Sequence, residues 1–186
     1  MSAAPEPPTP PTPGRSCAGC TMCCKLLGIQ ALDKPPGTWC AHCAVGEGCT
    51  IYASRPKECR DFNCAYVIDA ALSEEWAPKR SKIVVSVDPN SIVIFVDPSR
   101  PGAWRKPPFF AAIKTWAAAA APVGKQVLVF EGAQITAMLP DREKPLGERV
   151  PGQVFVLTRA QRPEGPVYDV LMVDPDDPRA KRVIAG

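Results

Sequence analysis

The sequence lacks the features that mark membrane, secreted and nucleic-acid-binding proteins. It contains no run of the roughly 18 to 20 apolar residues that a membrane-spanning helix needs. Its first residues, MSAAPEPPTPPTPG, contain neither the basic region nor the apolar core of a secretory signal. The formal net charge of +3 is small, and no basic stripe carries interleaved aromatic residues. We therefore expect a cytoplasmic protein in a reducing compartment that binds neither nucleic acid nor membrane.

Signatures of catalysis are equally scarce. His42 is the only histidine, which disfavours catalytic sites of the His-rich kind. No glycine-rich G-x-G-x-x-G fingerprint is present, which counts against a classical methyltransferase fold. Asp141, Arg142 and Glu143 offer acid–base groups, but no nucleophile or histidine accompanies them, so a charged turn between strands is the favoured interpretation. The sequence therefore predicts no particular reaction and favours a protein that is not an enzyme.

Cysteine, by contrast, is abundant, and all nine cysteines fall between residues 17 and 64. Stable disulfides are rare in a reducing compartment, where clustered thiols usually bind metal or carry out redox chemistry. Residues 15–66 also contain few large apolar side chains. A segment of about 50 residues with so thin a core usually needs a metal or cross-links to fold. Metal binding is therefore favoured, with a disulfide or redox switch and inert buried thiols as the alternatives.

The spacing of the thiols indicates how metals would be held. A C-x2-C pair directs both sulfurs toward one ion, and CAGCTMC (residues 17–23) contains two overlapping pairs, as in loops around iron–sulfur clusters. Cys23 and Cys24 are adjacent, and neighbours on a helix differ in direction by about 100°. We therefore expect them to face different metals or different edges of one cluster. The count suits two four-thiolate sites with one cysteine to spare, or one clustered multi-metal site; all-thiolate ligation favours zinc, iron–sulfur or Cu(I).

Four segments, CAGCTMCC, WCAHC, GCTIYASRPKEC and CRDFNC, resemble the YkgJ-type CxxCxxCC family of bacterial proteins. The resemblance covers residues 17–64, about a quarter of the chain. That family is described by eight cysteines proposed to chelate zinc or iron, and its motif is shared with a flagellin lysine N-methylase. The resemblance implies eight metal ligands in this chain: Cys17, Cys20, Cys23, Cys24, Cys40, Cys49, Cys59 and Cys64. Cys43 departs from the family pattern and His42 falls in its C-x-H step, so these two are further candidates.

Composition divides the chain into four parts. We expect a disordered proline-rich tail (1–14), a cysteine-rich metal-binding module (15–66), a linker with a short helix (67–81) and an α+β domain (82–186). Within the module, Ser54 is expected to cap a short helix that delivers Cys59 toward the metal.

The last part contains strand patterns on both sides of one helix. KIVVSV and SIVIFV are joined by the turn signal Asp88-Pro89-Asn90, and PPFFAAIKTWAAAAAP predicts a helix that Pro122 and Gly124 end. Four further strand patterns follow, arranged as two hairpins. This order predicts an α+β fold in which an antiparallel sheet carries the helix on one face.

Together these features predict a cytoplasmic protein that binds metal ions, with zinc held in two thiolate sites. Two alternatives stay open. The thiols can instead hold iron or a [4Fe-4S] cluster that serves a redox or S-adenosylmethionine-dependent activity. They can also form a storage or delivery site for metal. The sequence identifies no protein partner.

Overall fold

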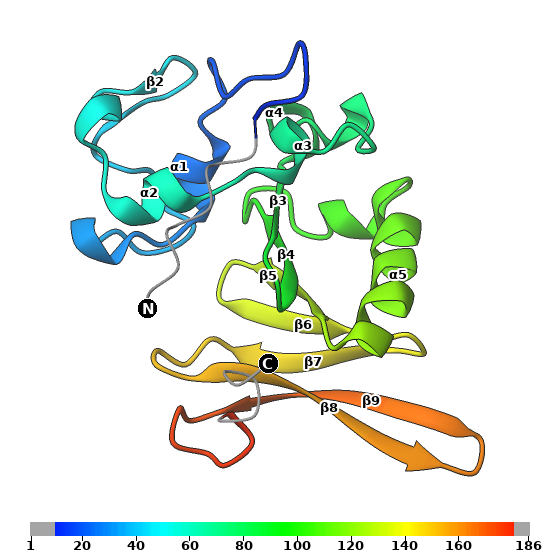
Figure 1. The fold of residues 1–186 in the computed structure, drawn as a ribbon. Helices are drawn as coiled ribbons and strands as arrows, with labels where there is room; N and C mark the ends of the chain where they lie inside the picture. The colour runs from blue at the N-terminus through cyan, green and yellow to red at the C-terminus, as the bar shows by residue number, and fades with distance from the viewer. Residues whose placement is uncertain (1–9, 181–186) are drawn as a thin grey trace, which may run out of the picture. The chain divides into compact units, whose positions relative to one another are not determined.

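The structure, a computed structural model, describes residues 10–180 and has the predicted α+β class, with one main helix (Figure 1). The chain folds into two compact units that divide after Ser86. Residues 1–9 of the expected proline-rich tail and residues 181–186 of the expected α+β domain lie outside the described residues. Between residues 10 and 180, no helix has the length and apolar character needed to cross a membrane.

The first unit consists of short helices and turns. Its elements are α1 (Met22–Leu26), η1 (Gln30–Leu32), β1 (Cys43–Ala44), β2 (Gly48–Cys49), η2 (Tyr52–Ser54), α2 (Lys57–Asp61), α3 (Ala65–Ile68), η3 (Glu74–Trp76) and α4 (Pro78–Ser81). Helices this short are unstable in isolation, because the cost of nucleation is recovered only over many residues. Their small apolar core includes Met22, Leu26, Val67 and Trp76. The first unit therefore depends on contacts between distant segments.

The second unit contains most of the regular structure. Its elements are β4 (Ser91–Val96), η4 (Ala103–Arg105), α5 (Phe109–Ala120), η5 (Ala121–Val123), β5 (Gln126–Glu131), β6 (Gln134–Met138), β7 (Glu143–Glu148), β8 (Val154–Arg162) and β9 (Gly165–Val173). β3 (Ile83–Val87) spans the division between the units, and the five-stranded sheet has the order β3-β4-β5-β6-β7. The predicted turn before β4 is confirmed: the Asp88 carboxylate accepts the amides of Asn90 and Ser91, both at 2.8 Å.

The sheet is not wholly antiparallel, and in this respect the prediction was wrong. β4 and β5 run parallel, with Ser91 opposite Gln126 and Val96 opposite Glu131. Parallel neighbours need a long crossover connection, and α5 supplies it because it lies between these two strands in the sequence. β5, β6 and β7 are antiparallel to one another.

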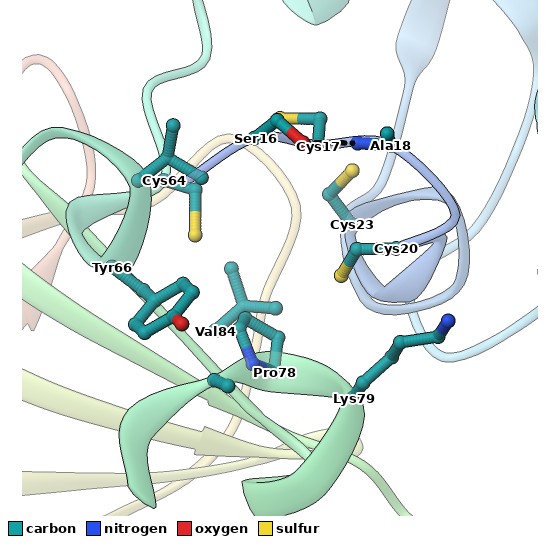
Figure 2. A pocket seen from close by; sticks show the side chains of 12 residues that line it. Ser16, Cys17, Ala18, Cys20, Cys23, Cys64, Tyr66, Pro78, Lys79 and Val84 are labelled. Carbon is teal, nitrogen blue, oxygen red and sulfur yellow. Dashed lines mark hydrogen bonds between the residues drawn. The ribbon is translucent and has the colours of Figure 1, made fainter. Parts of the chain in front are cut away.

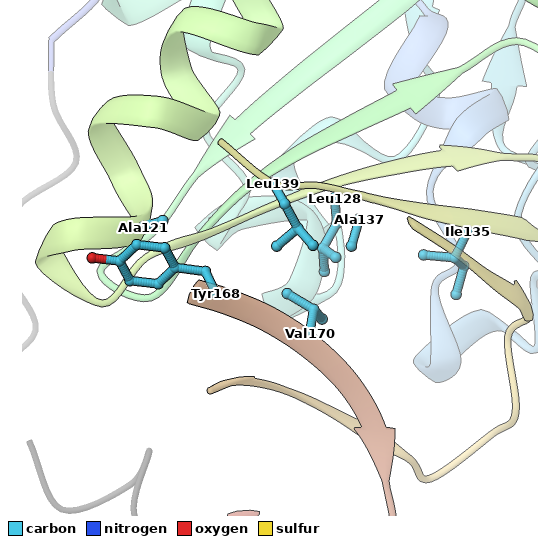
Figure 3. Close-up of a cluster of buried hydrophobic side chains, with 7 residues drawn as sticks. All are labelled: Ala121, Leu128, Ile135, Ala137, Leu139, Tyr168 and Val170. Atoms are coloured by element: carbon cyan, nitrogen blue, oxygen red, sulfur yellow. The ribbon is translucent and has the colours of Figure 1, made fainter. Parts of the chain in front are cut away.

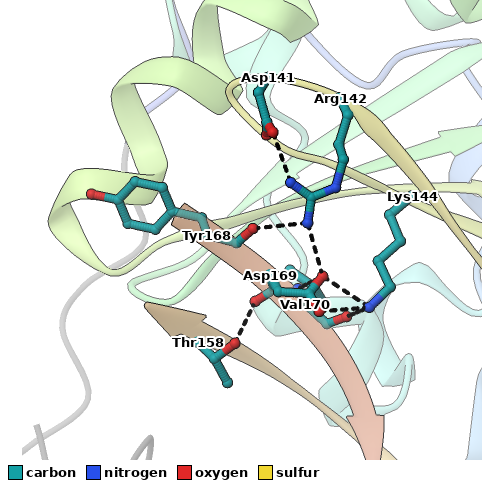
Figure 4. A network of polar contacts seen from close by, with 7 residues as sticks. All are labelled: Asp141, Arg142, Lys144, Thr158, Tyr168, Asp169 and Val170. Atoms are coloured by element: carbon teal, nitrogen blue, oxygen red, sulfur yellow. Dashed lines mark hydrogen bonds and ion pairs between the residues drawn. The ribbon is translucent and has the colours of Figure 1, made fainter. Parts of the chain in front are cut away.

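The expected charged turn at residues 141–143 is followed by β7, a strand that the sequence did not predict. Its residues, EKPLGE, are polar and include Pro145, which is tolerated because β7 lies at an edge of the sheet. Lys144 donates to both carboxylate oxygens of Asp169 on β9, at 2.8 and 2.9 Å, and to the carbonyl of Val170 (Figure 4). Arg142 donates to the Asp141 carboxylate at 2.8 Å. Lys144 therefore joins β7 to β9, and the charged side chains of Arg142 and Lys144 are both engaged in ion pairs.

The core of the second unit forms between the sheet and the β8–β9 hairpin. Figure 3 shows Tyr168 and Val170 of β9 facing side chains from the sheet and the segment after β6. The buried members of this cluster are Ala121, Leu128, Ile135, Ala137, Leu139, Tyr168 and Val170. The second unit thus has an apolar core of its own.

Candidate metal centre

Arg15 fixes the segment before the first cysteine to the distant helix α3. Its guanidinium lies 4.4 Å from the centre of the Tyr66 ring. It also donates to three main-chain carbonyls, those of Tyr66 (2.8 Å), Asp69 (2.8 Å) and Leu72 (2.5 Å). Because Cys17 follows Arg15 and Cys64 immediately precedes α3, this anchor brings the two ends of the cysteine-rich segment together.

Four cysteines line one cavity of about 180 Å³ (Figure 2). We call Cys17, Cys20, Cys23 and Cys64 the first thiol group. Tyr66, Pro78, Lys79 and Val84 are among the other residues that line this cavity. The loop that carries Cys17 and Cys20 turns tightly, with the Cys20 amide donating to the Cys17 carbonyl at 3.0 Å. Gly19 allows this turn because its φ is +63°, and a Cβ there would lie 3.1 Å from the Gly46 carbonyl oxygen.

The electrostatics of the first group reflect burial and mutual proximity. Burial raises the pKa of Cys64 to about 11, with smaller contributions from the thiols of Cys17 and Cys20. The amides of Val67 and Tyr66 at the start of α3 act in the opposite direction. Partial burial of the sulfur also raises the pKa of Cys17, and the neighbouring thiol of Cys20 raises it further. Thiolates at these positions would repel one another unless a cation lay between them.

The other five cysteines form what we call the second thiol group: Cys24, Cys40, Cys43, Cys49 and Cys59. The Cys40 amide donates to the Cys24 carbonyl at 3.0 Å, and the Cys43 amide donates to the Cys40 carbonyl at 3.1 Å. Cys43 and Cys49 are paired directly across β1 and β2. Cys59 lies on α2, which is tied to η1 because the Glu58 carboxylate accepts the amides of Gln30 and Ala31 (both 3.2 Å).

The thiols of the second group also interact with one another. Cys24 forms side-chain hydrogen bonds with Cys23 and Cys43; the bond with Cys23 is the largest cause of a strong rise in the pKa of Cys24. Burial, followed by the charge of Cys24, raises the pKa of Cys43 to about 11. Burial raises the pKa of Cys59 too, and Cys24, Cys40 and Cys49 add to the rise. The contact between Cys23 and Cys24 makes α1 the place where the two groups adjoin.

Of the eight cysteines named as ligands from the sequence, Cys17, Cys20, Cys23 and Cys64 line the cavity, and the other four are those grouped above with Cys43. Cys43, which departs from the family pattern, lies in the second group against Cys24. The contacts of His42 run through its main chain, where its carbonyl accepts the Thr50 amide (2.9 Å) and hydroxyl (3.1 Å). Sequence reasoning missed Lys34, a buried lysine among the thiols, because an isolated lysine carries no signal of burial.

One local prediction in this region was wrong. Ser54 does not cap the helix that carries Cys59: the N-cap of α2 is Pro56, and no side chain caps the helix. The Ser54 hydroxyl instead donates to the Ile51 carbonyl at 3.5 Å. Cys59 is positioned by the bonds between Glu58 and η1 rather than by a serine cap.

The donor set suits a soft metal, although the thiols do not yet converge. Within residues 10–180, no three Cys, His, Asp or Glu side chains meet closely enough to hold a metal ion. Zinc requires its sulfur ligands at about 2.3 Å. A zinc ion at either group would therefore require these thiols to lie closer together.

Similarity to known proteins adds no independent information about this centre. Comparisons of the chain with protein-family models, with curated proteins and with solved structures found no match. Its chemistry is therefore inferred from the positions and the electrostatics of the thiols.

Proposed function

We propose that this is a metal-binding protein whose cysteines chelate zinc at two thiolate sites. The first thiol group (Cys17, Cys20, Cys23 and Cys64) supplies one site, and the second group, with five thiols, supplies the other. The observation that carries the proposal is the division of the cysteines at Cys23 and Cys24. Cys23 lines the cavity with Cys64, while Cys24 interacts with Cys43. The side chains of Cys23 and Cys24 also interact with each other, so the two proposed sites adjoin at α1.

Electrostatics support a cation at each site. Metal ligands must be thiolates, so binding of zinc displaces protons from the cysteines. The raised pKa values of Cys43 and Cys64, both about 11, mean that neither thiol ionises readily near neutral pH without a cation. A bound zinc ion would favour the ionised thiols and draw them together. Metal loading should consequently weaken as the pH falls.

The folding of the first unit supports the same conclusion. Its longest helices, α1 and α2, have five residues each, and its apolar core is small. Small domains of this kind commonly gain their stability from a structural metal. The proposed role of zinc is therefore structural, and no reaction is assigned. The cysteine motifs also resemble the YkgJ-type family, whose cysteines are proposed to chelate zinc or iron, although no family model matches the chain.

A [4Fe-4S] cluster in the first group is the second candidate. Bacterial clusters of this kind take ligands from a C-x2-C-x2-C run and from one distant cysteine. Cys17, Cys20 and Cys23 form such a run, and Cys64 is the distant cysteine that lines the same cavity. In that case the protein would serve a redox or S-adenosylmethionine-dependent activity.

The test is elemental analysis and an absorption spectrum of the full chain purified without oxygen. We expect a colourless protein with about two zinc ions per chain. Brown protein that contains iron and labile sulfide would favour the cluster. Protein that carries no stoichiometric metal, and takes up none when zinc is added, would refute metal binding altogether.

Cysteine variants assign the ligands. Cys64→Ser leaves three thiols in the first group and should remove about one metal. Replacing both Cys43 and Cys59 by serine leaves three thiols in the second group and should likewise remove about one metal. Ser16→Ala is the matched control, because Ser16 lines the same cavity as Cys64 but offers no thiol. Loss of both metals in either cysteine variant would indicate one clustered multi-metal site instead of two.

A further inference from the structure

Lys34 is buried to a degree that is rare for lysine, with only 8% of its surface exposed. Its ammonium donates to the main-chain carbonyls of Lys25 (3.2 Å), Pro35 (3.1 Å) and Leu27. Lys25 and Leu27 lie at the carboxyl end of α1, where helix carbonyls have no partner within the helix. The Lys34 charge is therefore held against the end of the helix that carries Cys23 and Cys24.

The backbone around Lys34 is fixed in turn. Ile29 and Lys34 exchange two main-chain hydrogen bonds, of 2.9 and 3.0 Å, which close the loop that contains η1. Glu58 on α2 accepts two amides of that same η1 segment. Lys34 is thus tied on one side to α1, which carries Cys24, and on the other to α2, which carries Cys59.

The ammonium is bonded to carbonyls, and several thiols also act on it electrostatically. Burial lowers the pKa of Lys34, while the nearby thiols of Cys40, Cys24, Cys59 and Cys23 act against this effect and favour the charged lysine. The carbonyls that accept its hydrogen bonds are neutral and carry only partial negative charge. Thiolates at the neighbouring cysteines would supply the full negative charge that balances the ammonium. Three of the four thiols belong to the second group.

We propose that Lys34 is the built-in counter-cation of the second thiol group. Its charge offsets the negative charge that Cys24, Cys40 and Cys59 acquire as thiolates, and so strengthens the binding of a soft divalent cation there. A four-thiolate zinc site carries a net charge of about −2 that the interior must balance. This role rests on the proposed function, and it makes Lys34 a positioning residue rather than a ligand.

The test separates the charge of Lys34 from its hydrogen bonds. Lys34→Gln retains an N–H donor for the carbonyls but removes the charge, whereas Lys34→Arg retains both. Lys57→Gln is the matched control, since Lys57 lies two residues from Cys59 but its side chain is 80% exposed. Zinc affinity of the full chain is measured by competition with a chromophoric chelator.

We expect Lys34→Gln to lower the affinity for one of the two zinc ions by roughly 10- to 100-fold. This is the range found when the groups that support metal ligands are removed. Lys34→Arg and Lys57→Gln should stay within a few-fold of the native protein. If Lys34→Gln binds both zinc ions like the native protein, the charge has no role. If Lys34→Gln and Lys34→Arg lose zinc equally, including by failing to fold, the side chain acts through its shape and the proposal is overturned.

A metal-free measurement keeps this proposal separable from the proposed function. Iodoacetamide reacts with thiolates, and peptide-resolved mass spectrometry follows the modification of each cysteine. In Lys34→Gln, Cys24 should react several-fold more slowly than in Lys57→Gln, because the Lys34 charge favours its thiolate, while Cys64 in the first group should be unchanged. An unchanged Cys24 rate would overturn the role of Lys34. A slowed rate in a protein that binds no zinc would refute the proposed function alone.

Discussion

Replacing Arg15 by alanine should loosen the cysteine-rich unit at one defined place. Of the three carbonyl bonds that Arg15 makes, those to Tyr66 and Leu72 are partly buried and the one to Asp69 is exposed. A hydrogen bond from a charged donor contributes about 1.5 to 3 kcal/mol. Fixing the long arginine side chain costs up to about 2 kcal/mol of rotamer entropy. Counting the two partly buried bonds, we expect Arg15→Ala to destabilise this contact by about 1 to 4 kcal/mol.

Hydrogen exchange measured by mass spectrometry on the metal-free full chain is the assay. Two amides of α3 and its end report on the contact, those of Val67 and Asp69, which donate to Cys64 and Ala65. A loss of about 1 to 4 kcal/mol corresponds to exchange that is roughly 5- to 700-fold faster, because 1.4 kcal/mol is a factor of ten.

Arg55→Ala is the control for this prediction. Arg55 also lies over a tyrosine ring, that of Tyr52, at 3.8 Å, and donates to a carbonyl three residues away. Its bond is local and exposed, so its removal should change exchange in α3 very little. If Arg15→Ala accelerates exchange in α3 no more than Arg55→Ala does, the anchoring of Cys17 beside Cys64 is refuted.

Three further predictions concern stability. Chelation of bound zinc should abolish the protected amides of residues 15–66, while amides of β4 to β7 stay protected in hydrogen exchange; equal loss in both segments would contradict independent cores. The metal-free protein should lose stability in urea as the pH rises from about 9 to about 11, because Cys43 and Cys64 keep their protons up to a pKa of about 11 when folded but ionise earlier when unfolded. Double replacement of these two cysteines by serine should flatten this dependence, and an unchanged slope would contradict it. Leu128→Ala, at a side chain with 2% exposure, should cost the second unit about 2 to 5 kcal/mol in urea unfolding, whereas Val123→Ala, at 73% exposure, should cost far less.

Local patterns in the sequence predicted much of the second unit because they depend on neighbouring residues. The strand before Asp88 and the strand after it, the helix Phe109–Ala120 and the two later hairpins follow from periodicity and turn chemistry. The parallel direction of β4 relative to β5 does not follow from these patterns. A strand pattern does not say which strand will be its neighbour in the sheet. β7 escaped prediction because an edge strand can be polar and contain proline.

For the candidate site, the sequence by itself determined which atoms are available: nine thiols, one imidazole and a backbone with too thin a core to fold easily alone. It also set Cys23 beside Cys24, whose side chains leave the helix in directions about 100° apart. Only the tertiary structure decided the partners. Arg15 binds carbonyls more than fifty residues later and so places Cys64 with the first three thiols, and the η1 loop buries Lys34 among the others. These contacts join residues far apart in the chain, and no local pattern encodes which distant segments meet.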